Sequence, residues 1–114
     1  MDLVVTTSVV GNASVATVSG EIDVYTAPAL REKLTELVDS GATRIVVDMG
    51  QVGFCDSTGL GALVAALNYA RDRDVALSLA ATQERVLKVL RITGLDQLFT
   101  VYPSSDAATA AVGD

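Results

Sequence analysis

The chain is organised around one stretch of nine residues, Gly53-Phe54-Cys55-Asp56-Ser57-Thr58-Gly59-Leu60-Gly61. It follows the apolar segment 44–49, which is typical of a buried strand with Ile45 and Val47 in the core. It leads into the apolar segment 60–67, which is typical of a helix. We therefore expect a short polar turn between a strand and a helix. Ligands and partners of open α/β sheets usually bind at such turns.

The residue types within this turn also indicate a site. Asp56 has a short acceptor side chain that can cap the first free N–H groups of the helix, which places Ser57 in the first turn with its hydroxyl in solvent. Gly59 and Gly61 each cost a helix about 1 kcal/mol relative to alanine, and such broken local rules often mark a site. Their missing Cβ atoms would let a backbone or a phosphate approach Ser57. On these nine residues alone, tight packing of the turn is the simpler explanation.

Composition excludes several classes of protein. The 114 residues suit one domain with a real core, which we place at residues 1–114. With no histidine and one cysteine, the chain lacks the usual ligands of a zinc site and cannot form a Ser-His-Asp triad or an intrachain disulfide. A net charge of −6 without a basic stripe argues against direct nucleic-acid binding. No apolar run reaches membrane-span length and the first residues do not resemble a signal peptide, so we expect a cytoplasmic protein.

Hydrophobic periodicity and turn residues predict the order ββαβαβαβα. This is an α/β fold with a mixed sheet, parallel in its later part, and crossover helices. The expected strands are residues 3–10 and 13–19, joined by a Gly11-Asn12 hairpin turn, and residues 44–49, 75–80 and 99–102. The first expected helix runs from a Thr26 cap to a stop at Gly41, and the second from the central turn to about Arg73. A third helix is expected between a Thr82 cap and Gly94, and a weak helix begins at Ser104.

The segment Gly20–Tyr25 is expected to be a loop rather than a strand. It gathers two carboxylates and a phenol, from Glu21, Asp23 and Tyr25. Such a group can serve catalysis, but a solvated loop explains the spacing better.

Two segments together resemble the STAS domain of bacterial anti-sigma factor antagonists. The first runs from Gly20 through Asp23 and Thr26 to Leu34, and the second is Asp56-Ser57-Thr58-Gly59-Leu60-Gly61. Their starts are 36 residues apart (56 minus 20). The resemblance covers nearly the whole chain and implies a single STAS-like domain with the same ββαβαβαβα order.

The resemblance implies a regulatory binding protein, not an enzyme. In this family the serine after the aspartate, here Ser57, is phosphorylated by the anti-sigma factor, which is a serine kinase. The unphosphorylated form binds that kinase and releases a sigma factor, and a PP2C-type phosphatase reverses the switch. No cofactor or metal is expected in this chain, because the kinase supplies ATP and Mg²⁺. The partner-binding residues that the family resemblance implies are Glu21, Asp23, Tyr25, Thr26, Asp56, Thr58, Gly59, Leu60 and Gly61.

Two alternatives remain open from the sequence. A STAS domain can also be a stressosome scaffold or a subunit of a lipid-transport complex, with other protein partners. An enzyme is the alternative from another class, with Asp23, Asp48 and Asp56 as Mg²⁺ ligands. Against it, Asp48 lies in a strand expected to be buried and no P-loop is present. Cys55 is expected to be a small core residue rather than a redox site.

Overall fold

The computed structural model describes residues 3–81 and 83–111. Over these residues the elements follow the predicted order ββαβαβαβα, and the predicted α/β fold class is confirmed. The strands are β1 (Leu3–Val10), β2 (Ala13–Ile22), β3 (Arg44–Cys55), β4 (Ala76–Ala80) and β5 (Val101–Tyr102). The helices are α1 (Ala27–Asp39), α2 (Ser57–Arg71), α3 (Glu84–Ile92), the short 3₁₀ helix η1 (Leu95–Gln97) and α4 (Ser105–Ala110).

The strands form one mixed sheet in the order β1-β2-β3-β4-β5. β1 is antiparallel to β2, and the pairs β2–β3, β3–β4 and β4–β5 are parallel. Val10 pairs with Ala13 across the predicted two-residue turn, where Gly11 has the positive φ of 62° that a type II′ turn requires. The later strands are parallel because each is reached by a crossover through a helix.

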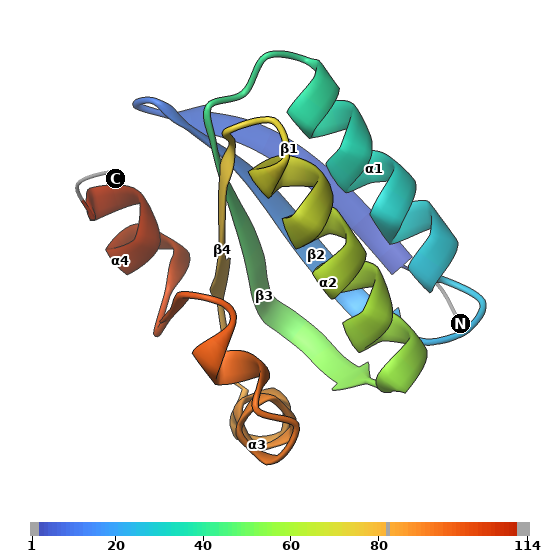
Figure 1. Ribbon diagram of the computed structural model, residues 1–114. Helices are drawn as coiled ribbons and strands as arrows, with labels where there is room; N and C mark the ends of the chain where they lie inside the picture. The colour runs from blue at the N-terminus through green and yellow to red at the C-terminus, as the bar shows by residue number, and fades with distance from the viewer. Residues whose placement is uncertain (1–2, 82, 112–114) are drawn as a thin grey trace.

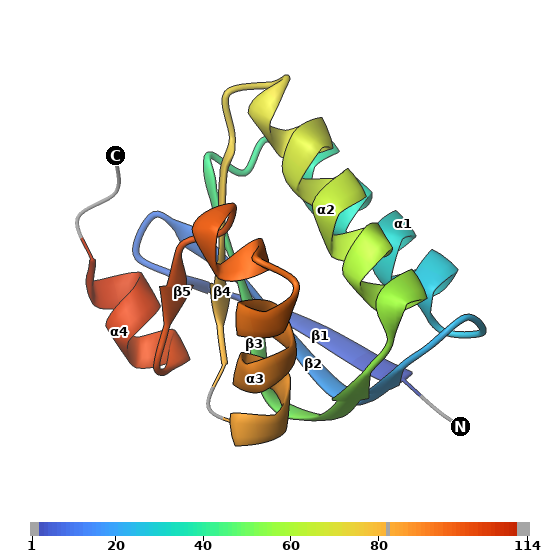
Figure 2. The ribbon, with the colours of Figure 1, turned by 60° about the horizontal axis from the view of Figure 1, so that its bottom comes forward.

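Helices cover the two faces of the sheet unequally (Figures 1 and 2). α1 and α2 lie side by side on one face, where they enclose the main core with Ile45 and Val47, both fully buried as predicted. α4 lies on the other face, where Ala108 packs against a second cluster that includes Val15. The buried Arg44 guanidinium donates to the carbonyl oxygens of residues 108 and 109 and so fixes α4 to the sheet.

Two predicted strand ends were wrong. The segment Gly20–Ile22, expected to be part of a loop, forms the end of β2, and β3 continues past residue 49 to Cys55. Glycines and polar residues suggested a turn at these places. They belong instead to two register shifts between the strands, after which pairing resumes and ends at Ile22 opposite Cys55.

Helix ends agree with most of the predicted signals. Gly41 and Gly94 follow α1 and α3 with positive φ, and the weak C-terminal helix forms with Ser104 as its cap. Thr26 is at the N-cap position of α1, but its hydroxyl does not cap the helix. The predicted cap Thr82 lies outside the described residues.

Candidate partner-binding site

Parallel pairing brings the two halves of the candidate site together. β2 and β3 run side by side and end at the same edge of the sheet, with Ile22 opposite Cys55. The backbone N–H of Asp56 donates to the carbonyl oxygen of Ile22 at 3.1 Å. The loop after β2 therefore adjoins the turn after β3, although the two bonded residues are 34 positions apart (56 minus 22).

The turn after β3 is a single residue, Asp56, so the predicted central turn is shorter than expected. Asp56 Oδ1 accepts the Gly59 N–H at 2.9 Å, which confirms the predicted cap of α2. Ser57 is the first residue of α2 and is exposed, as predicted. Among the hydrogen bonds of the described residues, the N–H groups of Ser57 and Thr58 have no acceptor. These groups and the helix dipole favour negative charge at Ser57, whereas the neighbouring Asp56 carboxylate opposes it.

The loop after β2 is held by its own side chains. Asp23 Oδ1 accepts the N–H groups of Tyr25 and Thr26, at 2.9 and 3.0 Å. Thr26 Oγ1 accepts the Asp23 N–H at 2.9 Å and donates to the Glu21 carbonyl at 2.8 Å. Desolvation raises the pKa of Asp23, but hydrogen bonds from Thr26 and Tyr25 outweigh it, and the pKa lies below its ordinary value. The loop is therefore a fixed platform that presents Tyr25, which is 87% exposed.

The two glycines of α2 have different roles. A Cβ at Gly59 would lie 2.5 Å from Ile22 Cγ2 and 2.9 Å from Cys55 Sγ, so close packing of the helix against the strands requires glycine there. A Cβ at Gly61 would meet nothing within 4 Å. Packing thus explains Gly59 and leaves Gly61 without a structural reason. Thr26, Gly59 and Leu60 are buried, so they position the site and contribute little of its surface.

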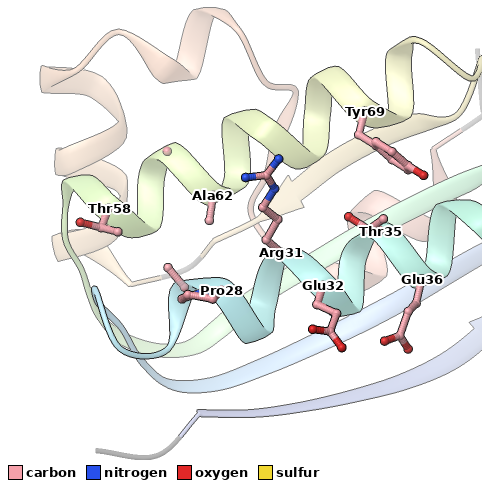
Figure 3. Close-up of a pocket in the computed structure, with 10 residues that line it drawn as sticks. Pro28, Arg31, Glu32, Thr35, Glu36, Thr58, Ala62 and Tyr69 are labelled. Carbon is pink, nitrogen blue, oxygen red and sulfur yellow. The ribbon is translucent and has the colours of Figure 1, made fainter.

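An open groove of about 680 Å³ lies between α1 and α2, and Thr58, the residue after Ser57, is among the residues that line it (Figure 3). Thr58 lies at one end of the groove and Tyr69 toward the other, and the Arg31 side chain extends from α1 toward α2. The missing Cβ of Gly61 leaves the groove open along α2. The sequence analysis did not connect Arg31 with the site. The lining residues are Ala27, Pro28, Arg31, Glu32, Thr35, Glu36, Thr58, Gly61, Ala62 and Tyr69.

Exposed apolar side chains lie beside the serine turn. Val24 is 55% exposed and Phe54 43% exposed, and Phe54 is opposite Glu21 in the β2–β3 register. Exposed apolar residues beside polar ones are typical of protein–protein interfaces. Sequence reasoning did not assign either residue to the site. The sequence did contain a signal for these two residues: each is a large apolar residue within or beside one of the two polar segments.

The three aspartates considered as magnesium ligands do not come together. Asp48 Oδ1 accepts the N–H of Gly50 at 3.0 Å, while Asp23 and Asp56 each accept N–H groups of their own turns. Within residues 3–81 and 83–111, no three potential ligands gather closely enough to hold a metal ion. The arrangement therefore offers no support for the metal-dependent enzyme considered above.

Cys55 faces the interior beneath the turn. It is 7% exposed, and burial, with the Asp56 charge as a second cause, raises the pKa of its thiol to about 12. A thiol that ionises so reluctantly is a poor nucleophile at neutral pH. The prediction of a small core residue is confirmed.

The five-stranded mixed sheet, with β3 leading through the capped turn at Asp56 into α2, places the chain in a class of small single-sheet α/β domains. The STAS domain family matches residues 4–108, and the chain belongs to that family. It is 37% identical over 89 residues to the anti-sigma-B factor antagonist of Bacillus subtilis (strain 168), covering 78% of this chain and 81% of that protein. The namesake from Staphylococcus aureus (strain NCTC 8325 / PS 47) is 37% identical, with coverages of 78% and 82%.

A solved structure agrees with these relatives. The crystal structure of an anti-sigma factor antagonist from Mycobacterium paratuberculosis superimposes with a TM-score of 0.86 at 32% identity. The match covers 96% of this chain and 93% of that one. The family resemblance inferred from the sequence is thereby confirmed. Within the described residues, no helix combines the length and apolar character needed to cross a membrane.

Proposed function

We propose that this protein is an anti-sigma factor antagonist whose binding is switched by phosphorylation of Ser57. The observation that carries the proposal is the exposed Ser57 hydroxyl at the start of α2, tied to the Asp23 loop by the Ile22–Asp56 hydrogen bond. The relatives named as antagonists support it. In this proposal the unphosphorylated form binds an anti-sigma factor that is also a serine kinase. The sigma factor held by that kinase is then released.

The partner surface has two parts in this proposal. Residues of the rim contact the kinase, and buried or half-buried residues hold the rim in place. The rim consists of Glu21, Asp23, Val24, Tyr25, Phe54, Ser57, Thr58 and Gly61. Its supports are Thr26, Asp56, Gly59 and Leu60. Exposed apolar residues of the rim, such as Phe54, supply most of the buried area, and the polar residues set the orientation.

The electrostatics of the turn explain how phosphate ends binding without refolding. Phosphoserine carries a charge of about −1.5 to −2 at pH 7. In the free protein, the N–H groups at the start of α2 and surrounding water compensate for part of this charge. In the complex, the same dianion lies beside Asp56 in a surface that had accepted a neutral hydroxyl. Burying an unmatched charge costs several kcal/mol, and each 1.4 kcal/mol is about tenfold in affinity. We expect an affinity loss of roughly a hundredfold or more.

Reversal requires access to the phosphate. Ser57 is exposed, so a PP2C-type phosphatase can reach it in the free protein. No base is needed in this chain for the forward step, because the kinase brings its own base with ATP and Mg²⁺.

The proposal is tested with Ser57→Ala and the neighbouring Thr58→Ala as its control. The partner is first isolated from a native cell extract in the presence and absence of ATP and identified by mass spectrometry. Ser57→Ala should bind this partner and take up no phosphate, whereas Thr58→Ala should be phosphorylated at Ser57. Phosphate uptake by Ser57→Ala at normal stoichiometry would assign the acceptor to another hydroxyl, Thr58 first. Capture of a scaffold or a lipid-transport assembly instead of a kinase would refute the antagonist role.

A second measurement separates a surface effect from a conformational one. Amide NMR spectra of the phosphorylated and unphosphorylated forms should differ near Ser57 and the loop from Glu21 to Thr26. The affinity for the kinase should fall at the same time. Large shifts spread across the sheet would show that phosphate acts through the fold, contrary to the proposal.

A further inference from the structure

The edge strand β1 has nearly the same sequence in both directions. Around Thr7, the residues Val4-Val5-Thr6 are mirrored by Ser8-Val9-Val10. β1 is the first strand of the sheet, and in the part of the chain that the structure describes its one strand neighbour is β2. The outer edge of β1 therefore presents a row of unpaired backbone N–H and C=O groups.

β1 lacks the features with which edge strands usually avoid further pairing. It contains no charged residue, proline or glycine. Its register with β2 is uninterrupted from Leu3 to Val10, so no bulge turns the edge away. Val9 is 76% exposed and Val4 53% exposed. Natural proteins protect exposed edges with charges, proline or bulges, so a bare edge indicates a partner strand.

The space beside the middle of β1 is free. Leu3 and Val5 are half-buried and line a pocket together with residues 29–36 of α1, whereas Thr7 and Val9, on the same face of the strand, are exposed. α1 thus covers only the beginning of the strand. A second strand can approach the centre of β1 without meeting a helix of this chain.

We propose that β1 pairs with β1 of a second copy of this chain, antiparallel about a two-fold axis at Thr7. In this register Val4 is opposite the second copy's Val10, Val5 opposite its Val9, and Thr6 opposite its Ser8. Directly opposed side chains point to the same face, and each of these pairs joins like with like. A two-fold interface requires a surface that is complementary to itself, which a palindromic strand provides. Pairing with a strand of an unrelated protein would not require β1 to have a palindromic sequence, so the palindrome favours a second copy of this chain.

The proposed seam is separate from the serine turn. Thr7 pairs with Ala16, six residues before Ile22 along β2 (22 minus 16), and six strand residues span about 20 Å. The dimer therefore leaves the Ser57 surface free. The inference does not depend on the function proposed above.

Sedimentation velocity tests the pairing on the full chain. The sedimentation coefficient of the wild type should rise from that of a monomer to that of a dimer as its concentration increases from about 10 μM to about 1 mM. Thr7→Lys places two like charges opposite each other on the axis and should weaken the dimer about tenfold or more. Thr100→Lys puts the same charge beside β5, at the other edge of the sheet, and should leave the dimer unchanged. A wild type that stays monomeric, or a Thr7→Lys variant that dimerises like it, overturns the proposal.

Cysteine variants test the register. Opposed residues of an antiparallel pair have Cα atoms about 4.5–5.5 Å apart, within the range of a disulfide. Oxidised Thr7→Cys should form a linked dimer, because only residue 7 is opposite itself. In Val9→Cys the two thiols would be separated by four residues, or about 13 Å, and should not link. The native Cys55 is buried in the wild type, so it should not link in either variant. Failure of Thr7→Cys to link, or equal linking at Val9, rules out this register.

Discussion

Replacement of the two glycines of α2 by alanine, one at a time, should change the stability in opposite directions. Both lie in the first five residues of the same helix. Alanine gains about 1 kcal/mol over glycine in a helix interior, so helix propensity alone predicts a similar gain at both positions. Any difference between the two variants must therefore come from what the new methyl group contacts.

At Gly61 the new methyl group meets nothing within 4 Å, and the full gain should appear as higher stability. At Gly59 it would lie 2.5 Å from Ile22 Cγ2 and 2.9 Å from Cys55 Sγ. Ile22 is fully buried, so its methyl cannot move aside without displacing the core. Overpacking of this kind costs about 1–3 kcal/mol, and two contacts this short place Gly59→Ala at the upper end. After subtraction of the helix gain, we expect a loss of about 2 kcal/mol.

Urea denaturation of the two variants and the wild type measures the difference. Gly61→Ala should raise the free energy of unfolding by up to about 1 kcal/mol, and Gly59→Ala should lower it by about 2 kcal/mol. The slopes of the transitions should stay the same, since neither change alters the surface exposed on unfolding. The packing argument is refuted by a Gly59→Ala variant at least as stable as the wild type. It is also refuted if Gly61→Ala is destabilised as strongly as Gly59→Ala.

Three further changes test the turn and its support. Asp56→Ala removes the side chain that accepts the Gly59 N–H and should lower the free energy of unfolding by about 1 kcal/mol. Asp56→Asn keeps an acceptor and should lower it by only about a few tenths of a kcal/mol. Equal losses for the two variants in urea denaturation would contradict the cap. The Cys55 thiol, with its pKa raised to about 12, should react with an aromatic disulfide at pH 8 only at the rate of unfolding, and fast labelling of the native protein would contradict its burial. Because the folded-state pKa of Asp23 is lowered, its charge stabilises the fold above the unfolded pKa of about 3.9 and this contribution is lost as the pH falls through the folded value. The stability difference between wild type and Asp23→Asn should thus be constant above about pH 5 and shrink toward pH 2 in acid titrations, and a difference that grows on acidification would reverse the sign.

Local patterns predicted the element order because each element has its own signal. The hairpin at Gly11, the stop at Gly41 and the cap at Asp56 are short-range features, and the structure confirms all three. The ends of β2 and β3 were predicted wrongly because glycine and polar residues there resemble a turn. Their strand pairing depends on the neighbouring strand, which a local reading does not include.

The sequence predicted the two segments that form the candidate site, but it did not predict the groove and the exposed apolar residues that surround them. The capping role of Asp56 and the exposed position of Ser57 at the helix start could both be predicted from the local sequence. The groove with Arg31 arises from the packing of α1 against α2, and Phe54 lies opposite Glu21 because β3 continues beyond the residues that the local pattern assigned to it. The two glycines also illustrate this limit. Only the distance from Gly59 to Ile22 distinguishes the glycine that packing requires from the one that it does not.

In the proposed switch, the hydrogen bond between Asp56 and Ile22 makes the serine turn part of a surface that exists only in the folded domain. The two segments adjoin only while β2 and β3 are paired, so the surface is absent from a nascent or unfolded chain. A kinase that contacts both segments should modify the native domain and neglect a linear peptide that spans residues 50–62. Phosphate incorporation into destabilised variants would then report their folded fraction. The switch would thereby operate only on molecules that have completed folding.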